Sequence, residues 1–290
     1  MPELPEVQIM VDDLKKRIIG RTILAAWSDW PKIIKFPKKF SDFADQIKNS
    51  KIINVARRAK YIEIHLNNDR ILMIHPRMTG HPLLGHWEIK NGKAIPTSTG
   101  AIQDKINGYV HLLFYLDNDL MLGISDARKF CTVRLGKKSL LENLPEIKKL
   151  GIDPFDKKLT VNKVATLLRS KKRPIKPTLL DQTLISGIGN IYADEILWLA
   201  KIHPLRKTNS LTDTEIKSLF KAMRLILKKA LLLRGSSFVD YRDTNGEKGR
   251  YSSVANVYNR KGEPCKRCNS KIIRIKIAQR SAHFCEQCQK

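Results

Sequence analysis

Four cysteines near the end of the chain restrict its fold more than any other feature. They form two Cys-x2-Cys pairs separated by 16 residues: Cys265, Cys268, Cys285 and Cys288. Two such pairs can present four thiolates to one tetrahedral Zn²⁺ ion and leave no open position for catalysis. The intervening residues include four isoleucines and suit a β-hairpin. The spacing predicts one structural zinc in a ribbon, with a chance or redox pair of motifs as the alternative.

The ribbon is strongly basic, and so is the whole chain. Residues 260–290 contain nine Lys and Arg against two Glu, and the full chain contains 54 Lys and Arg against 28 Asp and Glu, a net charge of +26. Such an excess favours a polyanionic partner, and a basic zinc ribbon is typical of a nucleic-acid contact. No apolar run reaches the roughly 18 uncharged residues of a membrane span, and the acidic start does not resemble a signal peptide. We expect a cytoplasmic protein without a membrane partner.

The first half of the chain changes from a helical to a strand pattern. Apolar residues recur at helical spacing over residues 4–19, and Gly20 is a stop signal. Two pairs of alternating segments follow, each joined by a turn of Asn and Asp residues. These patterns predict a helix and an antiparallel β-sandwich, with a long loop over residues 89–108. The expected strands include residues 61–66, 70–74, 109–116 and 120–125.

The chain becomes helical after Gly136. Thr212 and Glu215 form a capping box before the longest helix. Residues 235–253 show no period and predict a mobile loop. The expected helices cover residues 138–149, 160–170, 177–186, 190–201 and 212–234.

These patterns predict an α+β fold with three domains. We expect a β-sandwich domain with a flanking helix over residues 1–136, a helical domain over 137–258 and the zinc ribbon over 259–290.

The amino terminus carries a candidate nucleophile. Removal of Met1, which methionine aminopeptidases catalyse before a small residue, would expose Pro2 as a secondary amine. Such an amine can attack C1′ of a sugar and form an iminium. Glu3 and Glu6 follow one helical turn apart. Alternatively, these acids only complement the dipole of the helix that they begin.

A glycine-rich turn separates two of the expected helices. Residues 186–193 read SGIGNIYA, and the N–H groups that begin the second helix suit a phosphate. A plain turn and a solvated basic face are the alternative interpretations. Five basic residues without an intervening acid precede the turn: Arg169, Lys171, Lys172, Arg173 and Lys176.

Five short motifs occur in order along the whole chain. They are PELPEV at 2–7, RRAKY at 57–61, DARKF at 126–130, GIGNIYA at 187–193 and the ribbon that ends QCQK at 290. Together they resemble the bacterial formamidopyrimidine-DNA glycosylase family. The resemblance implies a bifunctional enzyme of base excision DNA repair. Such an enzyme removes oxidised purines (8-oxoguanine and formamidopyrimidines) from duplex DNA and nicks the abasic strand by β,δ-elimination.

The resemblance also implies roles for individual residues. Pro2 would form the Schiff base, Glu3 would be the general acid–base group, and Glu6 would support the opened sugar. Lys60 would contact the phosphates flanking the lesion and assist catalysis, and Arg280 of the ribbon would hold the same phosphates. Within the helix–two-turn–helix element, Asn190 would contribute to the phosphate clamp. The implied DNA contacts are Met78, Arg128, Phe130, Lys176, Asn190 and Tyr258.

Three of these residues match those that fill the vacated base stack. Met78 and Phe130 would replace lost stacking, and Arg128 would donate to the N3 and O2 acceptors of an unpaired cytosine, which predicts a preference for lesions opposite C. Without the resemblance, Met78 and Phe130 would be interpreted as core residues. Cys131 departs from the usual glycine, and Pro76 from the usual leucine; we expect Cys131 to be a buried thiol.

Two alternative functions stay open. An endonuclease VIII-like glycosylase for oxidised pyrimidines usually begins PEG, whereas Leu4 and the long 235–253 loop favour the purine branch. A non-catalytic zinc-ribbon DNA-binding protein is the alternative from another class. The expected partner is damaged double-stranded DNA, bound by a nucleoid-associated monomer.

Overall fold

The structure is a computed structural model that describes all 290 residues. It divides the chain into two compact units. Unit 1 comprises residues 1–148 and 233–252, and unit 2 comprises residues 149–232 and 253–290. Unit 1 combines a large β-sheet with helices, and unit 2 is helical with a small hairpin, which confirms the α+β class. No helix is both long and apolar enough to cross a membrane.

Unit 1 begins with α1 (Leu4–Ile18), the predicted amino-terminal helix. Its apolar face is completely buried: Val7, Met10 and Leu14 are 0% exposed and belong to the core of the unit. Gly20 follows with φ +83°, a conformation that lets the chain leave the helix without strain. The helix therefore forms because its 3.6-residue apolar stripe packs on the sheet.

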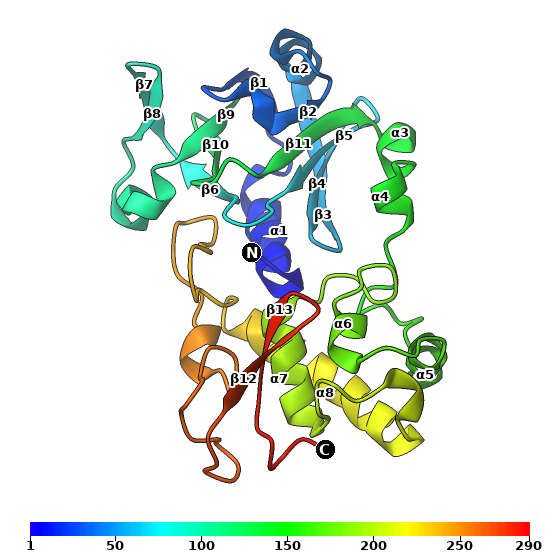
Figure 1. The fold of residues 1–290 in the computed structure, drawn as a ribbon. Helices are drawn as coiled ribbons and strands as arrows, with labels where there is room; N and C mark the ends of the chain where they lie inside the picture. Colours follow the sequence, from blue (N-terminus) through cyan, green and yellow to red (C-terminus); the bar gives the residue numbers. More distant parts are fainter. The chain divides into compact units, whose positions relative to one another are not determined.

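Nine strands form the sheet of unit 1 in the order β2-β11-β5-β4-β3-β1-β9-β10-β6. β3 joins the two halves, since its first two residues pair with β1 and the rest pairs with β4. Buried side chains from both halves and from α1 form one core, as expected for a sandwich. Figure 1 shows the course of these strands and of α1. Both predicted hairpins, β4–β5 and β9–β10, are present. The strands are β1 (Thr22–Trp27), β2 (Ile34–Phe36), β3 (Ser50–Arg58), β4 (Tyr61–Leu66), β5 (Arg70–His75), β6 (His81–Gly85), β9 (Val110–Leu116), β10 (Met121–Ser125) and β11 (Thr132–Lys137), with α2 (Phe40–Ile47) between β2 and β3.

Residues 89–108 contain regular structure, so the prediction of a long loop there is wrong. β7 (Trp87–Lys90) and β8 (Lys93–Pro96) form a hairpin. Its turn residues Asn91 and Gly92 have φ of +51° and +69°, the left-handed conformation that two-residue hairpin turns require. The Asn-Gly pair was the signal for this turn. Two 3-10 turns complete the segment: η2 (Gly100–Gln103) and η3 (Lys105–Asn107).

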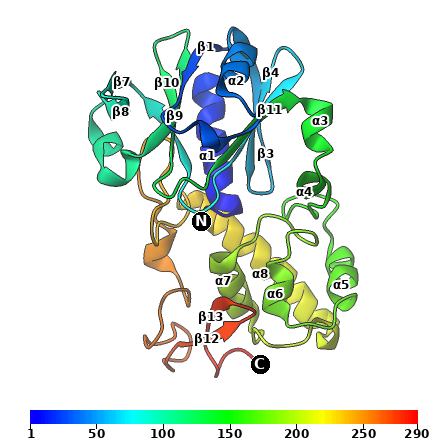
Figure 2. The same cartoon turned by 45° about the horizontal axis from the view of Figure 1, so that its top comes forward.

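Unit 2 is built on two neighbouring helices, α7 (Asn190–Ala200) and α8 (Asp213–Leu232), which lie side by side in both views (Figure 1, Figure 2). The predicted capping box is present: the N–H of Glu215 donates to Thr212 Oγ1 at 3.2 Å, and the N–H of Thr212 donates to Glu215 Oε2 at 2.8 Å. The remaining elements are α5 (Val161–Arg169), α6 (Ile175–Leu179), β12 (Ile273–Ile277) and β13 (Arg280–Phe284).

The helix expected over residues 177–186 is shorter than predicted. Only α6 is helical there, and it ends before Asp181. The Asp181 carboxylate accepts the N–H of Thr183 at 3.0 Å, and this local turn competes with continuation of the helix.

The boundaries of the two units differ from the three expected segments. In place of one helix over 138–149, α3 (Lys138–Glu142) and α4 (Pro145–Lys148) belong to unit 1, where Glu146 pairs with Arg134 at 3.0 Å. The 233–252 segment also belongs to unit 1. The ribbon lies in unit 2, where Cys265 packs in one apolar cluster with Trp198.

Candidate active site and nucleic-acid interface

The first residues of the chain and the β3–β4 turn bury several charged side chains in unit 1. Glu3, Glu6 and Lys60 are only 2%, 1% and 6% exposed, and Pro2 is buried as well. Ionised groups are rarely buried unless they are paired or functional, because removing a charge from water is unfavourable. Lys60 therefore differs from an ordinary lysine at the tip of a hairpin, whose side chain would be exposed to solvent.

The amino terminus lies within the field of these groups. Burial lowers the pKa of the terminal ammonium on Met1; against this, the carboxylates of Glu3, Glu6 and Asp240 raise it, and Lys60 lowers it further. This ammonium belongs to Met1, and removal of Met1 would leave the secondary amine of Pro2 at the start of the chain. The structure thus gathers the predicted residues around one amine. Asp240 also acts on this amine. It was not predicted from the sequence, because residues 235–253 show no periodic pattern that would distinguish it.

Glu6 is held from two sides. Its Oε2 accepts the N–H of Glu3 at 2.8 Å, and its Oε1 accepts the N–H and the hydroxyl of Ser236 at 2.8 and 3.1 Å. A β-carbon on Gly235 would come within 2.9 Å of Glu6 Oε1, so a glycine there lets the backbone lie against the carboxylate. Sequence reasoning missed Ser236, since its contact spans 230 residues.

The turn that carries Lys60 is fixed to α1. Ala59, the preceding residue, has φ +54°. Arg57 donates to the carbonyl of Ala59 at 3.1 Å and to Oε1 of Gln8 on α1 at 2.7 Å. The RRAKY motif therefore positions its lysine partly through its first arginine.

Two exposed loops of unit 1 carry the residues expected to fill a vacated base stack. Met78 is 37% exposed and Phe130 is 50% exposed. The guanidinium of Arg128 lies 4.8 Å from the centre of the Phe130 ring, a cation–π distance. Their exposure excludes the interpretation of Met78 and Phe130 as core residues.

Asp126 organises the loop of residues 126–131. It is completely buried and accepts the N–H of Arg128 at 3.2 Å, the N–H of Cys131 at 2.6 Å and the hydroxyl of Thr79. Thr79 belongs to the Met78 loop, so one carboxylate joins both loops. Cys131 is the predicted buried thiol, and burial raises its pKa, which makes it unreactive.

His75 supports the Met78 loop. The N–H of Arg77 donates to His75 Nδ1 at 3.0 Å, and Arg77 has φ +59°. Burial, with the cations of Arg77 and Lys60, lowers the pKa of His75 to about 3. The ring is therefore neutral near pH 7, which leaves Nδ1 free to accept this bond.

In unit 2, the glycine-rich turn leads into α7 as expected. Gly187 has φ +94°, and its N–H donates to Gln182 Oε1 at 2.8 Å. Asn190 is the first residue of α7, and its Oδ1 is buried without a hydrogen-bond partner. A buried polar atom in this state is a candidate for binding a ligand.

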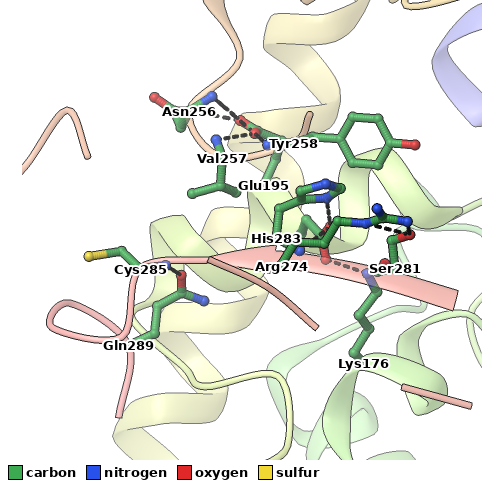
Figure 3. A network of polar contacts seen from close by, with 11 residues as sticks. Lys176, Glu195, Asn256, Val257, Tyr258, Arg274, Ser281, His283, Cys285 and Gln289 are labelled. Atoms are coloured by element: carbon green, nitrogen blue, oxygen red, sulfur yellow. Dashed lines mark hydrogen bonds and ion pairs between the residues drawn. The ribbon is translucent and has the colours of Figure 1, made fainter. Parts of the chain in front are cut away.

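Lys176 is buried, whereas a side chain that contacts DNA from the surface would be exposed. It is 0% exposed, its ammonium pairs with Asp194, and it donates to the carbonyl of Ser281 (Figure 3). Asp194 also accepts the N–H of His283 at 2.9 Å. A paired and desolvated ammonium is withdrawn from any phosphate. Lys176 instead links α6 to α7 and to β13.

The other two predicted contacts of unit 2 are Arg280, which lies within the ribbon, and Tyr258, which directly precedes it. Arg280 is exposed at the start of β13, directly before Ser281. The ring of Tyr258 packs edge-on against the ring of His283, with 5.1 Å between the ring centres (Figure 3). The backbone N–H of Tyr258 donates to Glu195 Oε1 at 3.0 Å.

The four cysteines form a metal-binding cluster in unit 2. Their Sγ atoms lie within 4.8 Å of one another, with 4.0 Å between Cys265 and Cys288 and 3.4 Å between Cys268 and Cys285. Tetrahedral zinc with Zn–S bonds of about 2.3 Å places thiolates roughly 3.8 Å apart. The donor set and its spacing fit one structural Zn²⁺, and Trp198 supports the site by donating to Cys265 at 3.4 Å.

Family models match three segments of the chain. They are the formamidopyrimidine-DNA glycosylase N-terminal domain over residues 1–133, the formamidopyrimidine-DNA glycosylase H2TH domain over 150–241, and a zinc finger found in FPG and IleRS over 262–290.

Similar full-length proteins and solved structures carry the same name. A formamidopyrimidine-DNA glycosylase from Herpetosiphon aurantiacus is 41% identical over 100% of both chains, and one from Pelotomaculum thermopropionicum is 38% identical over 100% of this chain and 99% of that protein. The complex of Lactococcus lactis Fpg with abasic-site DNA has a TM-score of 0.86 at 34% identity over 99% of both chains.

Proposed function

The chain belongs to the formamidopyrimidine-DNA glycosylase family, and we propose that Pro2, Glu3, Glu6 and Lys60 carry out the chemistry of that family. It is accordingly an enzyme of base excision DNA repair, a glycosylase and AP lyase that acts on oxidised purines. The observation that carries the proposal is the gathering of two buried carboxylates and a buried lysine around the amino terminus.

Pro2 is the nucleophile once Met1 has been removed. Its nitrogen attacks C1′ of the damaged nucleotide, the bond from C1′ to the base breaks, and the base leaves with the electron pair of that bond and a proton. Opening of the sugar then gives an iminium between Pro2 and C1′. This positive centre makes the protons at C2′ acidic, so the 3′ phosphate and then the 5′ phosphate leave by elimination.

Glu3 and Glu6 divide the proton chemistry. Glu3 supplies or accepts the protons of base release and elimination, while Glu6, which Ser236 holds in place, supports the opened sugar. Lys60 contributes a fixed cation for the phosphates that flank the lesion.

The remaining predicted residues bind DNA. Met78, Arg128 and Phe130 occupy the gap that the extruded nucleotide leaves, and Arg128 reads the opposite base. Asn190, Arg280 and Tyr258 of unit 2 hold phosphates. The four cysteines hold Zn²⁺, which supplies no chemistry and keeps the ribbon folded. We further propose that the protein acts as a monomer in the cytoplasm.

Borohydride trapping tests the proposal. Reduction of the iminium on an 8-oxoguanine duplex should give a covalent protein–DNA adduct that Pro2→Gly weakens and that an undamaged duplex does not form. Wild-type protein that forms no adduct with any damaged duplex would leave the non-catalytic DNA-binding alternative. Faster excision of thymine glycol than of 8-oxoguanine would favour the endonuclease VIII-like alternative.

A further inference from the structure

One arginine of unit 1 connects the 233–252 segment to the first helix. Arg234 donates to both oxygens of Asp13 on α1 at 3.2 and 2.5 Å, and its Nε and Nη2 donate to Oδ2 of Asp243 at 3.0 and 2.5 Å. Asp13 and Asp243 are only 9% and 3% exposed. A planar guanidinium can bind two carboxylates at once in this way, which an ammonium cannot match.

The backbone of Arg234 is in an unfavourable conformation for its residue type. Its φ is +56°, in the left-handed region that favours glycine, and the next residue, Gly235, has φ +78°. A residue other than glycine persists in such a position when the surrounding interactions determine it. Here those interactions are the bonds of the side chain to Asp13 and Asp243.

The segment that Arg234 anchors is the one that holds Glu6. Two bonds close the base of the segment: the N–H of Arg250 donates to the carbonyl of Leu233 at 2.8 Å, and the N–H of Tyr251 donates to the carbonyl of Gly235 at 2.9 Å. The next residue at this base, Ser236, contacts the Glu6 carboxylate.

The far part of the segment depends on the same network. Asp243 Oδ1 accepts the N–H groups of Asn245 and Glu247 at 2.9 and 3.0 Å, while its Oδ2 binds Arg234. The hydroxyl of Thr244 adds a bond to Asp13 at 3.2 Å. Each carboxylate therefore binds both Arg234 and the segment.

We propose that Arg234 is a positioning residue of the active site. It holds the base of the 233–252 segment against α1, and thereby fixes Ser236 and, through Ser236, the carboxylate of Glu6. This inference rests on the proposed function, because it concerns the carboxylate that supports the opened sugar there.

The test compares three variants in single-turnover nicking of an abasic-site duplex, at a temperature well below every melting temperature, because the opened sugar that Glu6 supports forms after the base has left. Arg234→Gly removes the side chain and tolerates the positive φ at this position. Arg234→Lys keeps the positive charge but lacks the planar guanidinium that binds both carboxylates. Arg21→Ala is the matched control, because it removes an exposed arginine of unit 1 that lies 4.0 Å from Asp117. Arg234→Gly should slow nicking about tenfold, Arg234→Lys should slow it less, and Arg21→Ala should match the wild type.

Two further measurements separate positioning from general damage. The affinity for a duplex with an uncleavable abasic analogue should be unchanged in Arg234→Gly. In a Glu6→Ala background, Arg234→Gly should leave the residual rate of nicking unchanged, since the group that it positions is absent.

Equal slowing with and without Glu6, or no slowing in either background, would overturn the inference. A wild-type protein that releases no base would instead contradict the proposed function, so the two failures are distinguishable.

Discussion

Ser236 donates two hydrogen bonds to a single oxygen of Glu6, one from its backbone at 2.8 Å and one from its hydroxyl at 3.1 Å. The two residues are 230 positions apart, and both are almost completely buried. The Glu6 carboxylate is therefore oriented by a segment that follows α8 directly in the chain.

The hydroxyl of this pair can be removed alone. Ser236→Ala keeps the backbone bond to Glu6 and loses a hydrogen bond to a charged group, which is worth about 1.5–3 kcal/mol. We expect single-turnover nicking of an abasic-site duplex to slow by roughly tenfold, without loss of affinity for the duplex. Ser41→Ala, which removes an exposed hydroxyl near Asp42, is the control. Nicking at the wild-type rate in Ser236→Ala would mean that the backbone bond alone positions Glu6.

Much of the fold follows from local sequence. The stripe of Val7, Met10 and Leu14 identified α1 because a helix with one apolar face has few other ways to bury it. The two β-hairpins were predictable for the same reason, with alternation and a polar turn in each. The β7–β8 hairpin was missed although Asn91-Gly92 is a strong local signal, because its strands have only four residues each and turn-forming residues from Pro96 to Gly100 follow directly.

The site was predictable only in part. The PELPEV and RRAKY motifs are short and could be found in the sequence alone, and the structure places Glu3, Glu6 and Lys60 near the amino terminus. Ser236 and Arg234 act through contacts to Glu6 and Asp13 that cross more than 200 positions, and no periodicity reports such contacts. The burial of Lys176 was not predictable either, because in a basic run the one buried member cannot be recognised without its partner Asp194.

The neutral state of His75 predicts a pH dependence of stability. Its pKa is about 3 in the folded protein, against about 6.5 in an unfolded chain, so between these values the unfolded state binds more protons. The free energy of unfolding that His75 contributes is therefore fully present above pH 6.5 and is lost as the pH falls toward 3. Urea unfolding at pH 7 and pH 4.5 should show a smaller decrease in His75→Asn than in the wild type. An equal decrease in both proteins would assign the acid sensitivity to other groups.

Because Lys176 and Asp194 form a buried pair, we expect replacement of Lys176 to lower the stability of the fold. Replacement of an exposed lysine that contacts DNA would instead weaken DNA binding. Lys176→Met leaves Asp194 buried without its cation, which typically destabilises by about 3–5 kcal/mol, so a marked fall in melting temperature is expected. Lys172→Ala is the control, since Lys172 is the exposed lysine of the same basic run. It should leave the melting temperature unchanged. A Lys176→Met protein with the wild-type melting temperature and weakened DNA binding would restore Lys176 as a DNA contact.

Arg280 predicts the complementary behaviour, a binding effect without a stability effect. Its side chain is exposed at the start of β13, where its removal leaves no buried group unpaired. If it contacts a phosphate, Arg280→Ala should weaken binding to damaged and undamaged duplexes alike. The slope of log K against log salt concentration should then become less steep by about one, because one fewer counterion is released. Titration of both duplexes at several salt concentrations measures this, and the melting temperature serves as the control for folding. An unchanged slope would remove Arg280 from the phosphate contacts, whereas a loss confined to damaged DNA would indicate that it reads the lesion.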